Sequence, residues 1–353
     1  MTLPMRKISP IIPAATGVYN HLPSPAQDVA RRVLGDDPAY LAWAATQSPQ
    51  VAAAVKLVGG GATTWGQLKT FAAGLKNLSL GELRKTLAEK KAKAQLEIKL
   101  ASHRQKDAER QSQLLVIKAK APAWLQGELI LVPGGLFMMG DDDLGFPTHP
   151  VWVSAYLMLS TPVTNMMWKM KADLLVRYGR IFERGDQPVV GVNRADALAY
   201  LDETQKELSS LGIQAQVLLP TEAQWERAAK ADRDFAYGTS DGTINHKKAV
   251  YGNLEDHQHT ASVKGKPANP LGFYGLCGNV WEWCRDGYNR TYNSELQIDP
   301  MDPASAEYYI VRGGSWYTRT LHCLRAACRG NYEPITCHDD LGFRFVIEPQ
   351  DAA

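Results

Sequence analysis

The sequence lacks the cysteine patterns of several protein classes. None of its five cysteines lies in the first 276 residues, their number is odd, and no C-x-x-C spacing occurs. These features argue against a disulfide framework and against a structural zinc ribbon. The net charge is only +2, from 39 Lys and Arg and 37 Asp and Glu. This balance argues against electrostatic attraction of the whole protein to nucleic acid.

Long apolar runs are also missing. The mean hydropathy is −0.27 and no uninterrupted apolar stretch reaches membrane-spanning length, so no membrane insertion is expected. Met1–Lys7 carries two charges with no apolar segment behind it, and Pro10 and Pro13 interrupt the stretch that follows. A secretory signal is therefore not expected, which predicts synthesis in the cytoplasm.

What the chain does have is enough apolar surface for a packed core. Its 353 residues are 45% apolar and 22% charged. This composition excludes a disordered, collagen-like or disulfide-dense protein. The length is more than one ordinary domain needs and is enough for two.

Residues 1–78 predict a helical N-terminal region. Pro25–Leu34 and Pro38–Ala45 have the pattern of short helices, and an Asp-Asp-Pro sequence separates them. Gly59–Gly61 is a flexible break further along the chain. The segment that follows this region has a different character.

Residues 79–121 predict one long helix. Ser79 and Glu82 have the spacing of a capping box, in which the Ser79 hydroxyl accepts a hydrogen bond from the amide three residues on. Leucines follow at helical spacing, and neither Gly nor Pro occurs between Glu82 and Ala121. Pro122 is expected to end the helix.

The charge of this helix leaves two interpretations open. Residues 84–120 contain eleven Lys and Arg against four Asp and Glu, a local excess of seven positive charges. One interpretation is a basic stalk or imperfect coiled coil, through which copies of the chain form a homo-oligomer. The other is an arm that binds a polyanion. No aromatic residue interleaves the charges, so bases cannot stack on them and nucleic acid is not the expected partner.

From Pro122 onward the pattern is that of an α+β domain over residues 122–353. Glu128–Pro133 and Val151–Tyr156 predict strands. Asn193–Leu208 and Thr221–Lys230 predict helices, the second with Thr221 as a candidate N-cap. Turn residues dominate the rest of the chain, so loops should outweigh regular elements.

Eight motifs occur in a fixed order in this region: Val132–Gly140, His149–Val151, Thr161–Asn165, Leu219–Ala229, Gly275–Trp283, Val311–Trp316, Leu324–Arg329 and Leu341–Arg344. This succession resembles the formylglycine-generating-enzyme (sulfatase-modifying factor) superfamily, whose domain has a C-type-lectin-like fold. The resemblance covers about residues 127–348. It implies a fold rather than a chemistry, because one fold can carry several functions.

Some motif residues also have a physical interpretation of their own. Arg325, Arg329 and Arg344 can donate hydrogen bonds to carboxylates or carbonyls and so join loops together. Asn279 and Glu282 lie in a motif that resembles a calcium-binding turn of the formylglycine enzyme, and their oxygens would suit calcium. The alternative is a buried, hydrogen-bonded Asn and Glu. We expect no cofactor, with calcium as the alternative.

The resemblance implies one of three kinds of protein. These are a copper-dependent oxidase that uses two cysteines, non-haem iron enzymes that form carbon–sulfur bonds, and binding proteins diversified by retroelements in phages and bacteria. The iron enzymes are disfavoured because His21 and His103 are isolated in the sequence.

The oxidase interpretation depends on how the cysteines are aligned. Counted forward from Gly313–Trp316 without a gap, Cys323 and Cys328 fall where the oxidase carries its cysteine pair. Two neighbouring thiolates would suit a soft ion such as Cu(I). With one gap, Ala326 takes the place of one of the two cysteines, and both Arg325 and Arg329 are matched.

The composition of residues 317–340 favours the third kind of protein. Retroelement diversification resembles adenine mutagenesis of Asn-type codons, which cannot yield Lys, Glu, Gln, Met or Trp. Among these only Glu333 occurs in the segment, in a framework Glu-Pro pair. An ordinary polar loop is the alternative. The predicted ligand-binding residues are Tyr317, Thr318, Thr320, Leu321, His322, Cys323, Cys328, Gly330, Asn331, Tyr332, Ile335, Thr336, Cys337, His338, Asp339 and Asp340.

The sequence therefore predicts a hypervariable ligand-binding protein rather than an enzyme. Its expected partner is a variable protein or cell-surface ligand, and incorporation in a phage virion is a further expectation. Tyr and His suit such contacts because they join apolar area to a polar tip. Two alternatives stay open: a copper oxidase that uses Cys323 and Cys328, and a catalytically inactive adaptor.

Overall fold

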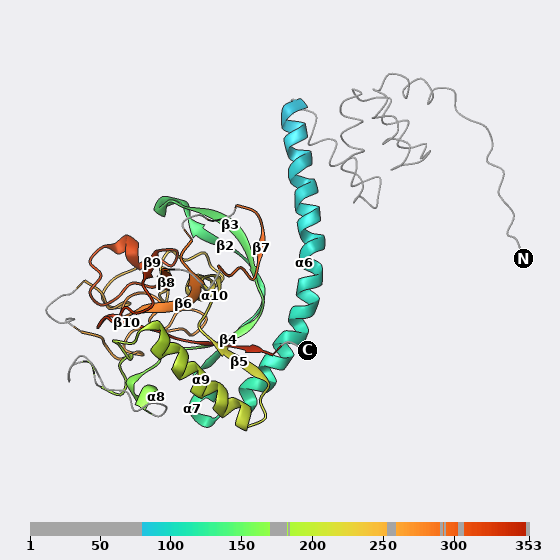
Figure 1. Cartoon of the computed structure of the whole chain (residues 1–353). Helices are drawn as coiled ribbons and strands as arrows, with labels where there is room; N and C mark the ends of the chain where they lie inside the picture. Colours follow the sequence, from blue (N-terminus) through green and yellow to red (C-terminus); the bar gives the residue numbers. More distant parts are fainter. Residues whose placement is uncertain are drawn as a thin grey trace, which may run out of the picture. The chain divides into compact units, whose positions relative to one another are not determined.

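The computed structural model describes residues 80–169, 182, 184–252, 259–289, 292, 294–302 and 307–350 (Figure 1). The chain divides into two compact units, Met1–Ser102 and His103–Ala353. The predicted helical region 1–78, with its two short helices, lies outside the described residues. Among the described residues, no helix combines the length and apolar character that a bilayer crossing requires.

The predicted long helix is confirmed as α6 (Leu80–Lys120), which ends just before Pro122. Its later turns are part of the second unit. The buried Asp107 carboxylate accepts hydrogen bonds from the Gly134 amide at 2.9 Å and from the Ala155 amide at 2.6 Å. Leu114 and Ile117 of the same helix face enter the main hydrophobic core. The end of α6 is therefore held by backbone groups and apolar packing of the domain that follows.

Three small sheets make up this domain. The first has the order β1-β4-β11-β5 and joins the start and the end of the domain, because β11 pairs with both β4 and β5. The second has the order β10-β6-β8-β9, and the third β2-β3-β7. The first sheet is formed by β1 (Leu129–Val132), β4 (Tyr156–Leu159), β11 (Val346–Pro349) and β5 (Ala215–Leu218). The second is formed by β10 (Leu341–Gly342), β6 (Trp281–Gly287), β8 (Tyr309–Arg312) and β9 (Arg329–Tyr332), and the third by β2 (Gly135–Asp141), β3 (Phe146–Val153) and β7 (Gln297–Ile298).

The two helices that the sequence predicts within the domain begin at the predicted residues. Helix α9 (Arg194–Ser210) has Asn193 as its N-cap, and α10 (Glu222–Lys230) has Thr221 as its N-cap in a capping box with Gln224. Helix α9 packs against β5, and α10 contacts β2 and β6 (Figure 1). The short elements are α7 (Ala123–Gln126), α8 (Asn165–Lys169), η2 (Asp142–Leu144) and η4 (Leu321–Leu324).

The predicted strand Glu128–Pro133 is confirmed as β1, but the predicted strand Val151–Tyr156 is wrong as a single element. The chain breaks between β3 and β4 at Ser154 and Ala155. The amide of Ser154 donates to the Asp299 carboxylate at 2.6 Å, and the amide of Ala155 donates to Asp107. The Asp299 and Asp107 carboxylates take the place of the strand partners that these two amides would have in a continuous strand. The two halves of the segment therefore join different sheets.

The core consists mainly of aromatic and branched side chains gathered from distant segments. One cluster contains Tyr200, Trp283, Phe343 and Phe345, and a second contains Trp225 with Phe273. Loops contribute many of these residues. The domain therefore has the mixed helix and sheet composition, with dominant loops, that the sequence predicts.

Candidate functional site

Burial divides segment 317–340 into two sets of positions. Of the framework residues, Leu324, Ala326, Ala327 and Arg329 are buried, Arg325 and Pro334 are partly exposed, and Glu333 is exposed. The exposed members of the predicted ligand-binding set are Tyr317, Thr320, Leu321, His322, Asn331, Ile335 and His338. The partly exposed members are Thr318, Cys323, Gly330, Tyr332, Thr336, Cys337, Asp339 and Asp340. The segment therefore offers solvent-facing side chains on a buried backbone frame.

Cys328 is the exception: the prediction places its side chain among the solvent-facing positions, and the structure buries it. The residue is 7% exposed, and its carbonyl accepts a hydrogen bond from the buried Arg312 guanidinium. Its amide donates to the Arg325 carbonyl at 2.9 Å. The backbone at Cys328 thus belongs to the frame, and the frame turns its side chain inward.

Two groups of exposed residues can be traced through their contacts. In the first, the Tyr332 and His338 rings lie 5.4 Å apart. Ser315 donates to the Asp340 carboxylate at 2.6 Å and also contacts the Thr318 hydroxyl, which places the start of the segment beside its end. Burial raises the pKa of Asp340 above its ordinary range.

The second group is η4, with Leu321 and His322 exposed. Within the described part of the chain, no hydrogen bond or ring contact joins the His322 side chain to Tyr332 or His338. Arg319, which is exposed and lies with its guanidinium 5.8 Å from the centre of the Tyr317 ring, is not among the predicted residues. The codon argument could have identified it, because Arg is not among the residues that diversified Asn-type codons cannot yield.

Buried arginine–carboxylate pairs form the frame under this segment. Arg344 binds Glu282 through two hydrogen bonds, of 2.6 and 2.7 Å, and the Trp225 indole donates to the same carboxylate at 2.8 Å. Arg329 binds Glu222 in the same way, at 2.7 and 2.8 Å. Such forked pairs fix geometry as well as charge. They join β9, inside the segment, to α10 and the loop after β10 to β6, as predicted for these arginines.

A third arginine binds at the edge of the frame. Arg325 is partly exposed, and its Nε donates to the Asp141 carboxylate at 2.6 Å. This contact crosses 184 residues of sequence. It attaches the turn before β9 to the end of β2.

The turn at Gly278–Asn279 holds the start of the segment. The Gly278 amide donates to the Gly313 carbonyl at 2.8 Å, and the Trp316 amide donates to the Asn279 carbonyl at 2.9 Å. The Asn279 carboxamide makes two hydrogen bonds with the Ala261 backbone. Because Arg344 and Trp225 occupy both Glu282 oxygens, Asn279 and Glu282 do not present free side-chain ligands for calcium. This geometry fits the alternative of a buried, hydrogen-bonded pair.

The five cysteines are free thiols in two different environments. Cys277 and Cys284 are buried, and burial raises the pKa of both. Cys323 is partly exposed and lies within hydrogen-bonding reach of the buried Cys328. Burial, together with the neighbouring Cys323, raises the pKa of Cys328 to about 12. At neutral pH, Cys328 is therefore a protonated thiol.

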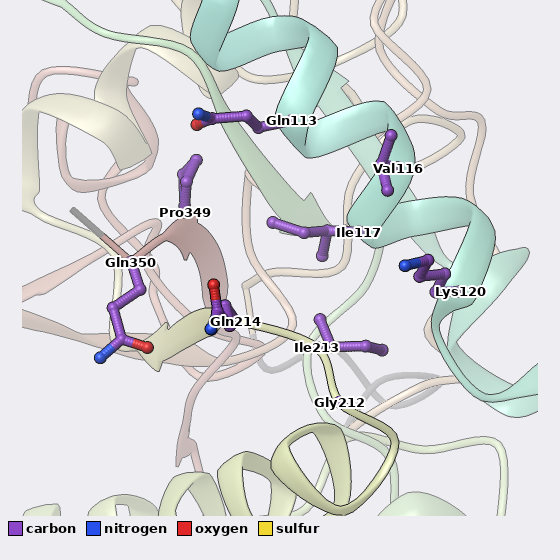
Figure 2. A pocket seen from close by; sticks show the side chains of 9 residues that line it. All are labelled: Gln113, Val116, Ile117, Lys120, Gly212, Ile213, Gln214, Pro349 and Gln350. Carbon is purple, nitrogen blue, oxygen red and sulfur yellow. The ribbon is translucent and has the colours of Figure 1, made fainter. Parts of the chain in front are cut away.

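A separate groove of about 310 Å³ lies beside the end of α6 (Figure 2). Val116 and Lys120 of α6 line one side, and Ile213 and Pro349 line the other. None of its lining residues is His, Cys, Asp or Glu, and none belongs to segment 317–340. Lys120 is the one ionisable side chain among its lining residues.

Comparisons with known proteins agree with this architecture. Residues 117–349 match the sulfatase-modifying factor enzyme 1-like domain. The formylglycine-generating enzyme of Streptomyces coelicolor is 33% identical over 179 residues, which are 46% of this chain and 52% of that enzyme. The Mus musculus formylglycine-generating enzyme is 30% identical over 185 residues, 48% of this chain and 46% of that enzyme. These matches span about half the length of the curated relatives.

Solved structures give the same picture of the fold. Treponema denticola variable protein 1 aligns with a TM-score of 0.53 and 25% identity, covering 63% of this chain and 95% of that one. PvdO from Pseudomonas aeruginosa aligns with a TM-score of 0.53 and 25% identity, covering 62% and 94%. The domain thus has the C-type-lectin-like fold, and the chain belongs to the family of the sulfatase-modifying factor enzyme 1-like domain.

Proposed function

We propose that this chain is a hypervariable ligand-binding protein, diversified by a retroelement, that recognises a protein or cell-surface ligand. The observation that carries the proposal is the division of segment 317–340 into solvent-facing positions and a buried frame. Side chains that face solvent can change at little cost, because surface substitutions usually alter stability by less than about 0.5 kcal/mol. Similarity to Treponema denticola variable protein 1 supports the same function.

Self-association through α6 and incorporation in a phage virion complete the proposal. Ala101, Ala108 and Leu115 are exposed at seven-residue spacing on this helix, which is the spacing of a coiled-coil seam. Copies joined in this way would present several binding faces and multiply weak contacts. Light scattering that gives the mass of a single chain would remove self-association from the proposal.

The fold should survive replacement of the exposed positions. In a library that varies Tyr317, Leu321, His322, Ile335 and His338 among codon-reachable residues, most members are expected to remain folded. Each substitution should change the free energy of unfolding by less than about 0.5 kcal/mol. Thermal unfolding of purified members measures this, and selection of the library against unrelated cell-surface proteins should yield binders of different specificity.

The matched control varies the same number of buried positions, Leu324, Ala326, Ala327, Cys328 and Arg329. These members should lose the cooperative unfolding transition. Equal loss of folded protein in both libraries would contradict the proposal. In the neighbouring DNA we expect a reverse transcriptase gene and a near-copy of the coding sequence for residues 317–340 that differs at adenines.

The neighbouring thiols of Cys323 and Cys328 favour a second candidate, a copper-dependent oxidase. Two soft donor atoms fit Cu(I), which would supply the redox chemistry. Loading would have to release the Cys328 proton, because burial keeps this thiol protonated at neutral pH. This candidate is compatible with the formylglycine-generating enzymes among the relatives.

A Cu(I) titration separates the two candidates. The oxidase candidate predicts one Cu(I) per chain, lost in both Cys323→Ser and Cys328→Ser and retained in Cys337→Ser, with affinity rising as the pH increases. Competition with a chelator of known affinity would measure it. Sub-stoichiometric binding that is unchanged by these substitutions would exclude the oxidase and leave the binding protein.

A further inference from the structure

A second cavity, of about 150 Å³, lies apart from segment 317–340. Its lining comes from β2, β3, the first turn of α10, the end of β6 and the chain around β7. The residues that give it chemical character are His149, Glu222, Asp286, Tyr292 and Asp302. None of its lining residues belongs to the predicted ligand-binding set.

His149 presents an unused hydrogen-bond acceptor in this cavity. The side chain is 1% exposed, and its Nδ1 lies 2.9 Å from the Pro147 carbonyl. A carbonyl can only accept, so Nδ1 carries the proton and Nε2 of the neutral ring carries a lone pair. Nε2 is buried without a partner. A buried polar atom in this state costs stability unless something binds it.

Tyr292 adds a second unsatisfied group beside the first. Its hydroxyl is buried without a partner, and its ring centre lies 4.7 Å from that of His149. The Arg329 guanidinium lies 4.4 Å from the centre of the Tyr292 ring. That arginine is neutralised by Glu222, so its charge is already balanced.

Two carboxyl groups complete the lining. Asp286 is buried and accepts hydrogen bonds from the Glu222 amide at 2.8 Å and from the Asp302 amide at 3.3 Å. Among the described residues, no Lys, Arg or His lies within 4.0 Å of either aspartate carboxylate. Burial, together with the nearby Glu222, raises the pKa of Asp286 to about 7. The cavity lining is therefore rich in hydrogen-bond acceptors, and burial raises the pKa of both aspartates, so a bound cation would favour their ionised forms.

We propose that this cavity binds the primary ammonium group of a small organic amine. An ammonium group is a cation with N–H donors, and the cavity lining offers it the Nε2 lone pair of His149 and the carboxylates of Asp286 and Asp302. No set of three or more His, Cys, Asp or Glu side chains in the described residues has the geometry of a metal site. An anion would be repelled by the two aspartates. This site is distinct from the proposed function and does not depend on it.

The test uses the full chain with methylammonium chloride, at ionic strength held constant with sodium chloride. With ¹⁵N-labelled histidine, one ring nitrogen signal should shift saturably in the millimolar range, which is what so small a ligand allows. Asp302→Asn should weaken binding at least tenfold. Asp143→Asn is the matched control, because that carboxylate is 88% exposed and does not line the cavity, and it should leave binding unchanged.

Binding should also depend on pH through Asp286. The charged and titratable groups around it are Glu222, Asp302, Arg285, Arg194 and Cys284, with His149 in the same cavity lining. Methylammonium stays protonated from pH 6 to pH 8, as lysine does. Because a carboxyl with a pKa of about 7 is mostly neutral at pH 6 and mostly ionised at pH 8, the affinity should rise about tenfold between them.

Several outcomes would overturn the proposal. Tetramethylammonium has no N–H donor, so an equal response to it would indicate unspecific charge binding. An unchanged affinity in Asp302→Asn would place the amine elsewhere. A histidine signal that is unaffected by the amine would mean that water alone satisfies His149. Melting temperatures measured with the same compounds give an independent readout of binding to the folded state.

Discussion

Replacing Glu282 by Gln is expected to lower the free energy of unfolding by about 3–5 kcal/mol, the usual cost of removing one partner from a buried ion pair. Glu282 and Arg344 are both 0% exposed. The substitution leaves the Arg344 guanidinium without a counter-charge and turns an amide NH₂ toward a donor. Arg344 also binds the Leu159 and Tyr274 carbonyls, so the strain reaches the end of β4 and the loop at Tyr274. Urea unfolding followed by tryptophan fluorescence measures the loss.

The matched control is Arg184→Gln in the exposed pair that Arg184 makes with Asp186 at 3.1 Å. This variant should lose less than about 1 kcal/mol, because water screens exposed pairs. A loss of that small size in Glu282→Gln would mean that the buried pair does not hold the frame. Since Arg344 follows segment 317–340 directly and Glu282 lies in β6, a loosened pair should also weaken ligand binding.

Local signals made the helices predictable. Pro122 follows the end of α6, and the capping residues Asn193 and Thr221 mark the starts of α9 and α10, within three residues of the amides that they bind. The strand break at Ser154 could not be predicted in the same way. It depends on Asp107 and Asp299, which lie 48 and 145 residues away from the amides that they bind.

The candidate site shows the same division. Exposure of Tyr317 and Ile335 follows from the polar composition of their segment, which the sequence displays directly. The inward position of Cys328 depends on Arg312, whose own position is fixed by Glu226 on α10. His149 gave no usable signal as a site residue, because β2, β3, β6 and α10 must fold together before its cavity exists.

Gly278→Ala is expected to cost about 3–5 kcal/mol, the range typical of a buried backbone clash added to an unfavourable dihedral angle. Gly278 has a φ of 78°, and a Cβ atom there would collide with the Val250 carbonyl oxygen. That carbonyl accepts a hydrogen bond from the Asn279 amide at 2.8 Å. Relief of the collision therefore breaks the turn that holds Gly313 and Trp316 in place. Chemical unfolding measures the loss.

Gly145→Ala separates the collision from the dihedral strain. Gly145 has a φ of 74°, almost the same as Gly278, but a Cβ atom there would meet nothing within 4 Å. This variant should lose only the left-handed backbone penalty of about 1–2 kcal/mol. If the two variants lost equal stability, the close approach of Val250 would have no energetic weight. A larger loss at Gly278, together with weaker ligand binding in Gly278→Ala alone, would indicate that the Gly278–Asn279 turn positions the start of segment 317–340.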